Sequence, residues 1–108
     1  MSYRVILSPA ALADLDRYVE YIAVDQQMPE TATRWLEKAL AEVQTLSTLP
    51  NRCPPAPEDE KSQHRIRMLI VDRCLFLYRV DEATRSVRIL RMRHGSQQPL
   101  DLSQPALD

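Results

Sequence analysis

Arginines cluster in the C-terminal half of the chain, and two of the runs that contain them alternate with apolar residues as β-strands do. Arg65 and Arg67 belong to one run, and Arg91 and Arg93 belong to another that ends at His94. Because successive side chains of a strand point to opposite faces, each pair of arginines is expected to share a face. Guanidinium groups form bidentate hydrogen bonds with phosphates and carboxylates. These five residues are therefore predicted to bind an acidic protein segment or a nucleic acid.

Two other interpretations of the basic residues stay open. Arginines on exposed strands also solubilise a sheet and protect its edges, and we assign Arg79, Arg85 and Arg88 to that class. His94 lies close to two arginines and has the chemistry of a general acid or base, although a single histidine at a strand end is more often structural. The sequence contains no Gly-rich phosphate loop, no metal-binding helix motif and no nucleophile elbow, so small-molecule catalysis has little support.

The cysteines and histidines do not indicate a metal centre. A zinc site would have to combine Cys53, His64, Cys74 and His94, and no two of these residues form the close pairs that zinc sites favour. We predict no metal and no cofactor, and we expect both cysteines to be reduced thiols.

The net charge of −1 conceals a division along the chain. Residues 10–60 carry four basic against ten acidic side chains, a net of −6, whereas residues 61–95 carry nine basic against three acidic side chains, a net of +6. Such an asymmetry indicates a polyanionic or acidic partner for the basic half. It is equally consistent with two halves that neutralise each other across the fold.

The first half of the chain predicts a strand followed by two helices. Residues 3–7 are rich in aromatic and β-branched residues, as strands are. Ser8 is a good N-cap and Pro9 is favoured at the next position, so a helix is expected to begin there. A second helix is expected to begin at Pro29 and to end before Pro50. The short connection and the two apolar stripes predict an antiparallel helical hairpin.

The second half predicts a loop and a sheet. Prolines exclude regular structure from residues 51–64, where the run Glu58–Lys61 is expected to be solvated and mobile. Three strands are expected after it, joined by short turns into a meander. They span residues 65–71, 74–80 and 86–94.

The alternation also predicts how the sheet is covered. Ile66, Met68 and Ile70 share the apolar face of the first meander strand, and we expect the helices to cover that face. The opposite face, which carries the paired arginines, is then expected to be partly basic and open.

Together these elements predict one α+β domain in residues 1–95, with an N-terminal strand, an antiparallel helical hairpin and a three-stranded antiparallel meander packed on the helices. Residues 96–108 are expected to form a loosely ordered C-terminal tail. No apolar run approaches the ~20 residues that a membrane helix needs, so no membrane partner is expected. The N-terminus is too short and too polar for a signal peptide, so a cytoplasmic location is expected.

The order and spacing of these segments resemble the RelE/ParE superfamily of toxins from type II toxin–antitoxin modules, and they are nearer to ParE. The resemblance covers about residues 3–98. It is carried by Tyr3-Arg4-Val5, Ser8-Pro9-Ala10-Ala11, Asp14-Leu15, Tyr21-Ile22, Ala32, Leu46, Leu49-Pro50, Arg67-Met68-Leu69-Ile70-Val71, Phe76-Leu77-Tyr78-Arg79-Val80-Asp81 and the run from Val87 to Gly95.

The resemblance implies a cytoplasmic bacterial toxin that inhibits growth and is held inactive by a cognate antitoxin protein. The antitoxin or the cellular target would then bind the five basic residues named at the outset. ParE-type members poison DNA gyrase, whereas RelE-type members cleave mRNA on the ribosome with clustered arginines and lysines and a C-terminal tyrosine. A nuclease set in this chain would consist of Arg65, Arg67, Arg73, Arg93 and His94.

The residues after Gly95 depart from both patterns. Ser96 and Gln97 stand where the nucleases have a basic residue and then a tyrosine, and where ParE-like tails commonly have an arginine. We therefore expect a ParE-like inhibitor of DNA gyrase that is not a nuclease. The alternatives are a RelE-like ribosome-dependent mRNA endoribonuclease and a toxin-derived binding module without activity.

Overall fold

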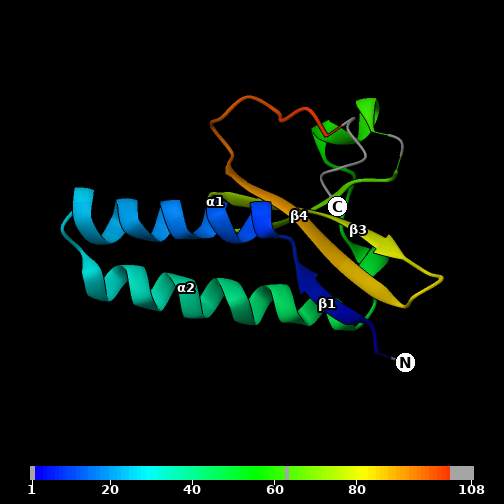
Figure 1. Ribbon diagram of the computed structural model, residues 1–108, viewed down its shortest axis with the longest axis horizontal. Coiled ribbons are helices and arrows are strands. Elements are labelled where there is room, and N and C mark those ends of the chain that lie inside the picture. Colours follow the sequence, from blue (N-terminus) through cyan, green and yellow to red (C-terminus); the bar gives the residue numbers. More distant parts are fainter. Residues whose placement is uncertain (1, 63, 103–108) are drawn as a thin grey trace.

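The computed structural model describes residues 2–62 and 64–102 of the chain (Figure 1). An N-terminal strand leads into two helices, which are followed by a three-stranded meander. The elements in chain order are β1 (Arg4–Leu7), α1 (Pro9–Glu20), α2 (Pro29–Gln44), β2 (Arg67–Val71), β3 (Cys74–Asp81) and β4 (Ser86–His94).

All four strands form one mixed sheet in the order β1-β4-β3-β2. Strand β1 runs parallel to β4, and the other neighbours are antiparallel. The prediction of an α+β fold with a helical hairpin and an antiparallel meander is confirmed, and the N-terminal strand adds to the β4 side of the meander.

Local capping fixes where α1 begins. The Ser8 hydroxyl accepts a hydrogen bond from the Ala11 amide at 3.0 Å, and Pro9 occupies the first turn. The same hydroxyl donates to the Leu90 carbonyl at 2.8 Å, so the cap also ties the helix to β4. The predicted start at Ser8-Pro9 is confirmed, because a serine cap followed by proline is a signal that depends only on neighbouring residues.

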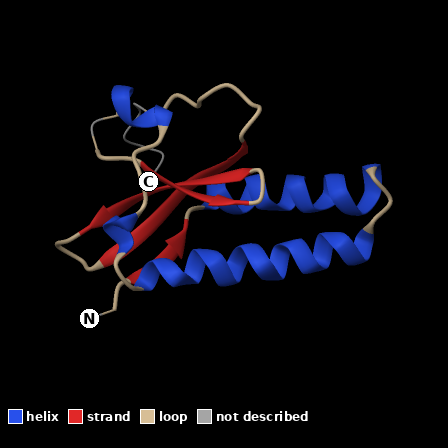
Figure 2. Cartoon of the chain, turned by 180° about the vertical axis from the view of Figure 1, so that it is seen from behind, coloured by secondary structure: helices blue, strands red, loops and turns tan. Residues whose placement is uncertain are grey.

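The connection between the helices is less regular. Helix α1 continues into a π-helical turn, Tyr21–Asp25, and Gln27 adopts a left-handed φ of 55° before α2 begins at Pro29. Helix α2 ends at Gln44, several residues before Pro50, and a 3₁₀ turn follows. Figures 1 and 2 show that the tip of the hairpin projects beyond the sheet.

Both faces of the sheet are covered, the first by the hairpin and the second by the segment that precedes β2 together with residues 96–102 (Figure 2). The strand residues buried under the hairpin are Leu69, Val71, Cys74, Phe76, Tyr78, Val87, Ile89 and Met92. The second cluster consists of Ala56, Ile66, Leu77, Leu90 and Leu102, with Met68, Leu75 and Leu100 packed against it.

This arrangement corrects the expected orientation of the first meander strand. Ile66 and Met68 were expected to face the helices, but they belong to the second cluster, whereas Leu69 and Val71 face the helices. The sequence alternation separates the two faces but does not say which one the hairpin covers, because both are apolar. Strand β2 also begins at Arg67 rather than at residue 65.

The proline-rich segment contains two 3₁₀ turns, Pro50–Arg52 and Pro57–Lys61. The expectation that its charged run is solvated is wrong for Glu58, which is 3% exposed because its carboxylate pairs with an arginine of β4. In the tail, Leu102 is buried and Leu100 packs beside it, while residues 103–108 lie outside the described part of the chain.

Candidate functional site

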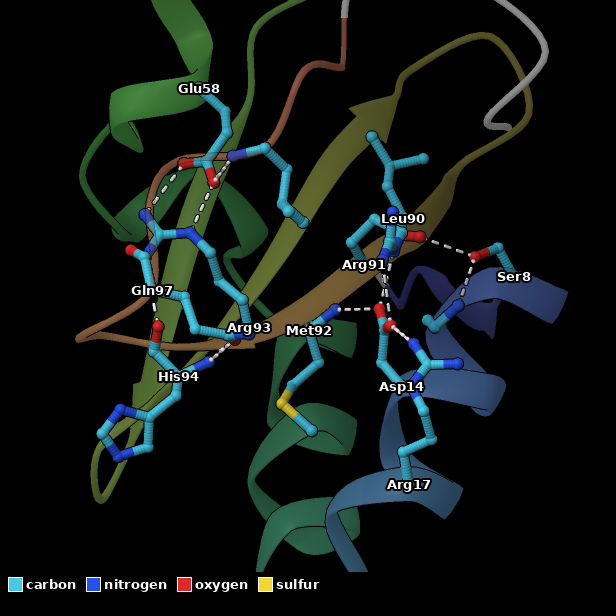
Figure 3. Close-up of polar contacts among 12 residues, drawn as sticks. Ser8, Asp14, Arg17, Glu58, Leu90, Arg91, Met92, Arg93, His94 and Gln97 are labelled. Atoms are coloured by element: carbon cyan, nitrogen blue, oxygen red, sulfur yellow. Dashed lines mark hydrogen bonds and ion pairs between the residues drawn. The ribbon is translucent and has the colours of Figure 1, made fainter.

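Arg91 of β4 is held by Asp14 of α1 (Figure 3). Its Nε donates to Asp14 Oδ2 at 2.7 Å and its Nη2 donates to Oδ1 at 3.0 Å. Arg17 donates to the same carboxylate, and the Met92 amide donates to Oδ2 at 2.9 Å. Asp14 is 6% exposed, so this carboxylate is a buried acceptor for two guanidinium groups and one amide.

The position of Asp14 follows from the length of β1. Strand β1 pairs with β4 only as far as Leu7 opposite Ile89, which leaves the end of β4 without a neighbouring strand on that side. Ser8 and Asp14 replace the missing strand, because they bond the Leu90 carbonyl and the Met92 amide. The polar start of α1 therefore satisfies the backbone of β4 where its sheet partner stops.

Arg93 of β4 pairs with Glu58, which lies in the 3₁₀ turn Pro57–Lys61. Its Nε donates to Glu58 Oε2 at 2.6 Å and its Nη2 donates to Oε1 at 3.2 Å, while the Leu100 amide donates to Oε2 at 3.0 Å. Burial alone would raise the pKa of Glu58, but the hydrogen bonds from Arg93 and Leu100 outweigh it and hold the pKa below its ordinary value. This charged pair joins the 3₁₀ segment, β4 and the tail.

The prediction that Arg91 and Arg93 share an open face is therefore wrong. Their strand partners, Leu77 and Leu75, both face the second cluster, so the face that the two arginines share is covered. A register shift after Leu77 adds an irregularity to the ladder beside Arg91. Arg93 is 4% exposed, and both guanidinium groups are already neutralised within the fold.

Arg65 and Arg67 lie elsewhere. Arg67 Nη1 donates to the Cys53 carbonyl at 2.6 Å, so it fastens the proline-rich segment to β2. Arg65 is exposed, and its Nε lies 3.3 Å from Asp59 Oδ1. The five predicted binding residues therefore do not form one cluster, and their part in binding a partner stays a prediction.

A groove of about 720 Å³ lies between α1, the end of β4 and the tail. It brings together Arg91, Arg93 and His94 from the predicted set, together with Arg73, which was predicted only as a nuclease residue. The other residues that line it are Asp14, Arg17, Tyr18, Tyr21, Gln26, Met92, Ser96, Gln97 and Leu100. The groove is therefore basic along the sheet edge and partly aromatic along the helix.

Sequence reasoning missed Asp14 and Glu58 as partners of the arginines. For Asp14 a signal existed: it lies among Ala11, Leu15 and Tyr18 on the inward side of the helix, where a carboxylate needs a cation. For Glu58 no comparable signal exists, because the residue sits in an irregular segment without periodicity.

The described residues offer no metal centre. Within residues 2–62 and 64–102, no three side chains of histidine, cysteine, aspartate or glutamate gather as ligands. Cys53 and Cys74 are both free thiols, and burial raises the pKa of Cys74. Over the same residues, neither helix combines the length and the apolar composition needed to cross a bilayer.

The sequence was compared with models of known families and the fold with known structures, and both comparisons found similar toxin–antitoxin proteins. A sequence model of the family described as ParE toxin of type II toxin–antitoxin system, parDE, matches residues 5–99. A structure of the chromosomal ParDE toxin–antitoxin system from P. aeruginosa is similar with a TM-score of 0.67 and 21% identity, over 86% of this chain and 96% of that one.

A second similar structure is the toxin–antitoxin complex RelBE2 from Mycobacterium tuberculosis, with a TM-score of 0.58 and 23% identity, over 87% of this chain and 99% of that one. A comparison with curated protein sequences gave no match. Because the family model spans nearly all the elements of the domain, the chain belongs to the ParE toxin family of type II toxin–antitoxin systems.

Proposed function

We propose that this chain is a ParE-like toxin that inhibits DNA gyrase rather than cutting RNA, and that a cognate antitoxin neutralises it in the bacterial cytoplasm. The observation that carries the proposal is the family match over residues 5–99. Gyrase as the target rests on the resemblance to ParE-type toxins.

The groove supports a function other than RNA cleavage. Cleavage of a phosphodiester needs cations placed to stabilise charge as it develops on the phosphate. Arg93 is paired with the buried carboxylate of Glu58, and Arg91 shares the buried carboxylate of Asp14 with Arg17, so both arginines are already engaged within the fold rather than free to bind a phosphate. The residues after Gly95 add no tyrosine and no basic side chain.

The hairpin supports binding of an antitoxin. Several large apolar side chains on it are exposed and are available to pack against a partner. They are Leu12, Tyr21, Val24, Met28 and Leu40. An antitoxin segment that forms an amphipathic helix would cover such a surface, and both similar structures are of toxin–antitoxin systems.

A ribosome-dependent ribonuclease is the second candidate, because Arg73, Arg93 and His94 line the same groove. In that case the arginines stabilise the scissile phosphate and His94 supplies the proton. A toxin-derived binding module without activity is the third candidate.

Induced expression in bacteria separates these functions. We expect growth arrest, loss of supercoiling activity when the purified chain is added to gyrase, and rescue by the protein of a short neighbouring reading frame. Gyrase supercoiling activity that stays unchanged, at concentrations where the rescuing protein binds the chain, would contradict the proposed target.

Primer extension on translated mRNA tests the nuclease. Cleavage of the mRNA that Arg73→Ala and His94→Ala abolish would establish it. Expression without growth arrest would leave only the binding module.

A further inference from the structure

Arg73 is the arginine of the groove whose side chain has no partner among residues 2–62 and 64–102. It follows Asp72 in the turn between β2 and β3, and its carbonyl accepts a hydrogen bond from the Gly95 amide at 2.8 Å. Its side chain is exposed, lines the groove, and makes no hydrogen bond or ion pair with any residue that the structure describes. The backbone bond holds Arg73 next to the end of β4, where His94 lies.

His94 supplies a second donor at the same place. The Ser96 amide donates to His94 Nδ1 at 3.1 Å, so this nitrogen is an acceptor. In the neutral ring the proton is therefore assigned to Nε2, which becomes a donor. Gln97 Oε1 accepts from the His94 amide at 2.8 Å and fixes the backbone that carries the ring. Arg73 and the Nε2–H of His94 are thus two donors that line the same groove.

The charge of the groove suits a few carboxylates better than a polyanion. Four arginines line it, one aspartate lies among them, and Glu58 neutralises Arg93 from behind, which leaves a net of about +2. Tyr18, Tyr21 and Met92 give the groove apolar surface as well. An extended polynucleotide has a charge at every phosphate and requires a longer track of unpaired cations.

We propose that this groove binds an acidic, partly apolar segment of a partner protein, and that Arg73 and the Nε2–H of His94 hold one carboxylate of that segment. The inference deepens the proposed function, on which it rests for the source of the segment: the antitoxin. The sequence pattern predicted that the partner binds Arg91 and Arg93. In the structure these two arginines already pair with carboxylates of the chain, so we assign the charged contact to Arg73 and His94 instead.

Nuclear magnetic resonance offers an independent reporter, because Gly95 is the single glycine of the chain and donates to the Arg73 carbonyl. The probe is a blocked peptide with two glutamates among leucines and alanines, compared with its glutamine counterpart and with hexauridylate. We expect the acidic peptide to shift the Gly95 amide at millimolar concentration, and the glutamine peptide and hexauridylate to bind more weakly.

Two arginine variants complete the experiment. Arg73→Ala should weaken binding of the acidic peptide about tenfold or more, the effect of losing a charge-assisted hydrogen bond. Arg34→Ala removes an exposed arginine of α2 that lies outside the groove, and it should bind as the parent does. Unchanged intrinsic fluorescence of Trp35 in both variants verifies that they fold.

The proposal is wrong if Arg73→Ala binds the acidic peptide as tightly as Arg34→Ala, if the glutamine peptide binds equally well, or if no probe shifts Gly95. Tighter binding of hexauridylate would assign the groove to RNA instead. Growth arrest with no peptide binding would refute the groove contact and leave the toxin assignment intact. Peptide binding without growth arrest would refute the toxic activity and leave the groove contact intact.

Discussion

Replacing Glu58 by glutamine tests whether the buried ion pair with Arg93 holds the second core together. The side chains of Arg93 and Glu58 are 4% and 0% exposed, so the guanidinium cannot turn to water when the carboxylate is lost. Removing one partner of a buried pair costs about 3–5 kcal/mol. Glutamine keeps the shape and one acceptor oxygen, so we expect Glu58→Gln to lower the free energy of unfolding by ~3 kcal/mol.

Urea unfolding followed by the fluorescence of Trp35, the single tryptophan, measures this loss. With a urea m-value of about 1.5 kcal/mol/M for a domain of this size, the midpoint should fall by ~2 M. Lys38→Met is the matched control, because Lys38 pairs with Asp72 at 2.8 Å while both side chains are about half exposed, at 55% and 49%. Water screens such a pair, so the control should change the midpoint far less.

The dependence on pH gives a second check. The pKa of Glu58 lies below its ordinary value of 4.5 in the folded chain. A depressed carboxyl pKa stabilises the fold above the ordinary value, and the stabilisation is lost as the pH falls through the depressed value. The difference in unfolding free energy between the parent and Glu58→Gln should therefore be full at neutral pH and shrink below about pH 4.5. A difference that equals the Lys38→Met effect, or that stays constant into acid, would refute the reasoning.

Three further substitutions probe local contacts, each measured as the change in the free energy of unfolding. Ser8→Ala removes the helix cap and the bond to the Leu90 carbonyl, and it should cost about 1–2 kcal/mol; no change would mean that water replaces the cap. Tyr78→Phe leaves the Pro50 carbonyl without the phenol that donates to it at 2.6 Å, and it should cost about 1–2 kcal/mol, unless the carbonyl finds another donor. Leu49→Gly should stabilise by up to ~1 kcal/mol, because Leu49 has a left-handed φ of 48° and is 73% exposed; a loss would show that its side chain contributes packing.

The features that the sequence predicted well depend on neighbouring residues. The start of α1 needs only a hydroxyl and a proline in adjacent positions, and the strand β4 was predicted with the bounds Ser86–His94 that the structure has. The end of α2 was predicted less well. Pro50 restricts only the residue before it, whereas the helix already ends at Gln44 and gives way to a 3₁₀ turn and the left-handed Leu49.

The sheet faces show where periodicity stops being informative. Alternation placed Arg91 and Arg93 on one face, and their strand partners agree. The alternation did not predict that this face is covered. The covering residues belong to an irregular segment and to the tail, and neither has a periodic pattern of apolar residues. Glu58 lies 35 positions before Arg93, and no local pattern connects them.

The division of charge along the chain acquires a physical meaning from these contacts. Asp14 of the acidic half neutralises Arg91 across 77 positions, and Glu58 neutralises Arg93 across 35. Because those two arginines bind carboxylates of the chain itself, the asymmetry of charge overstates the surface that is available to a partner. Arg73, which makes no such contact with the described residues, is then a groove cation whose charge an acidic segment can still neutralise, while Arg17 and Arg91 share the single negative charge of Asp14. Ion pairs within the chain therefore stabilise the fold, and a partner protein can bind only the basic side chains that these ion pairs leave exposed.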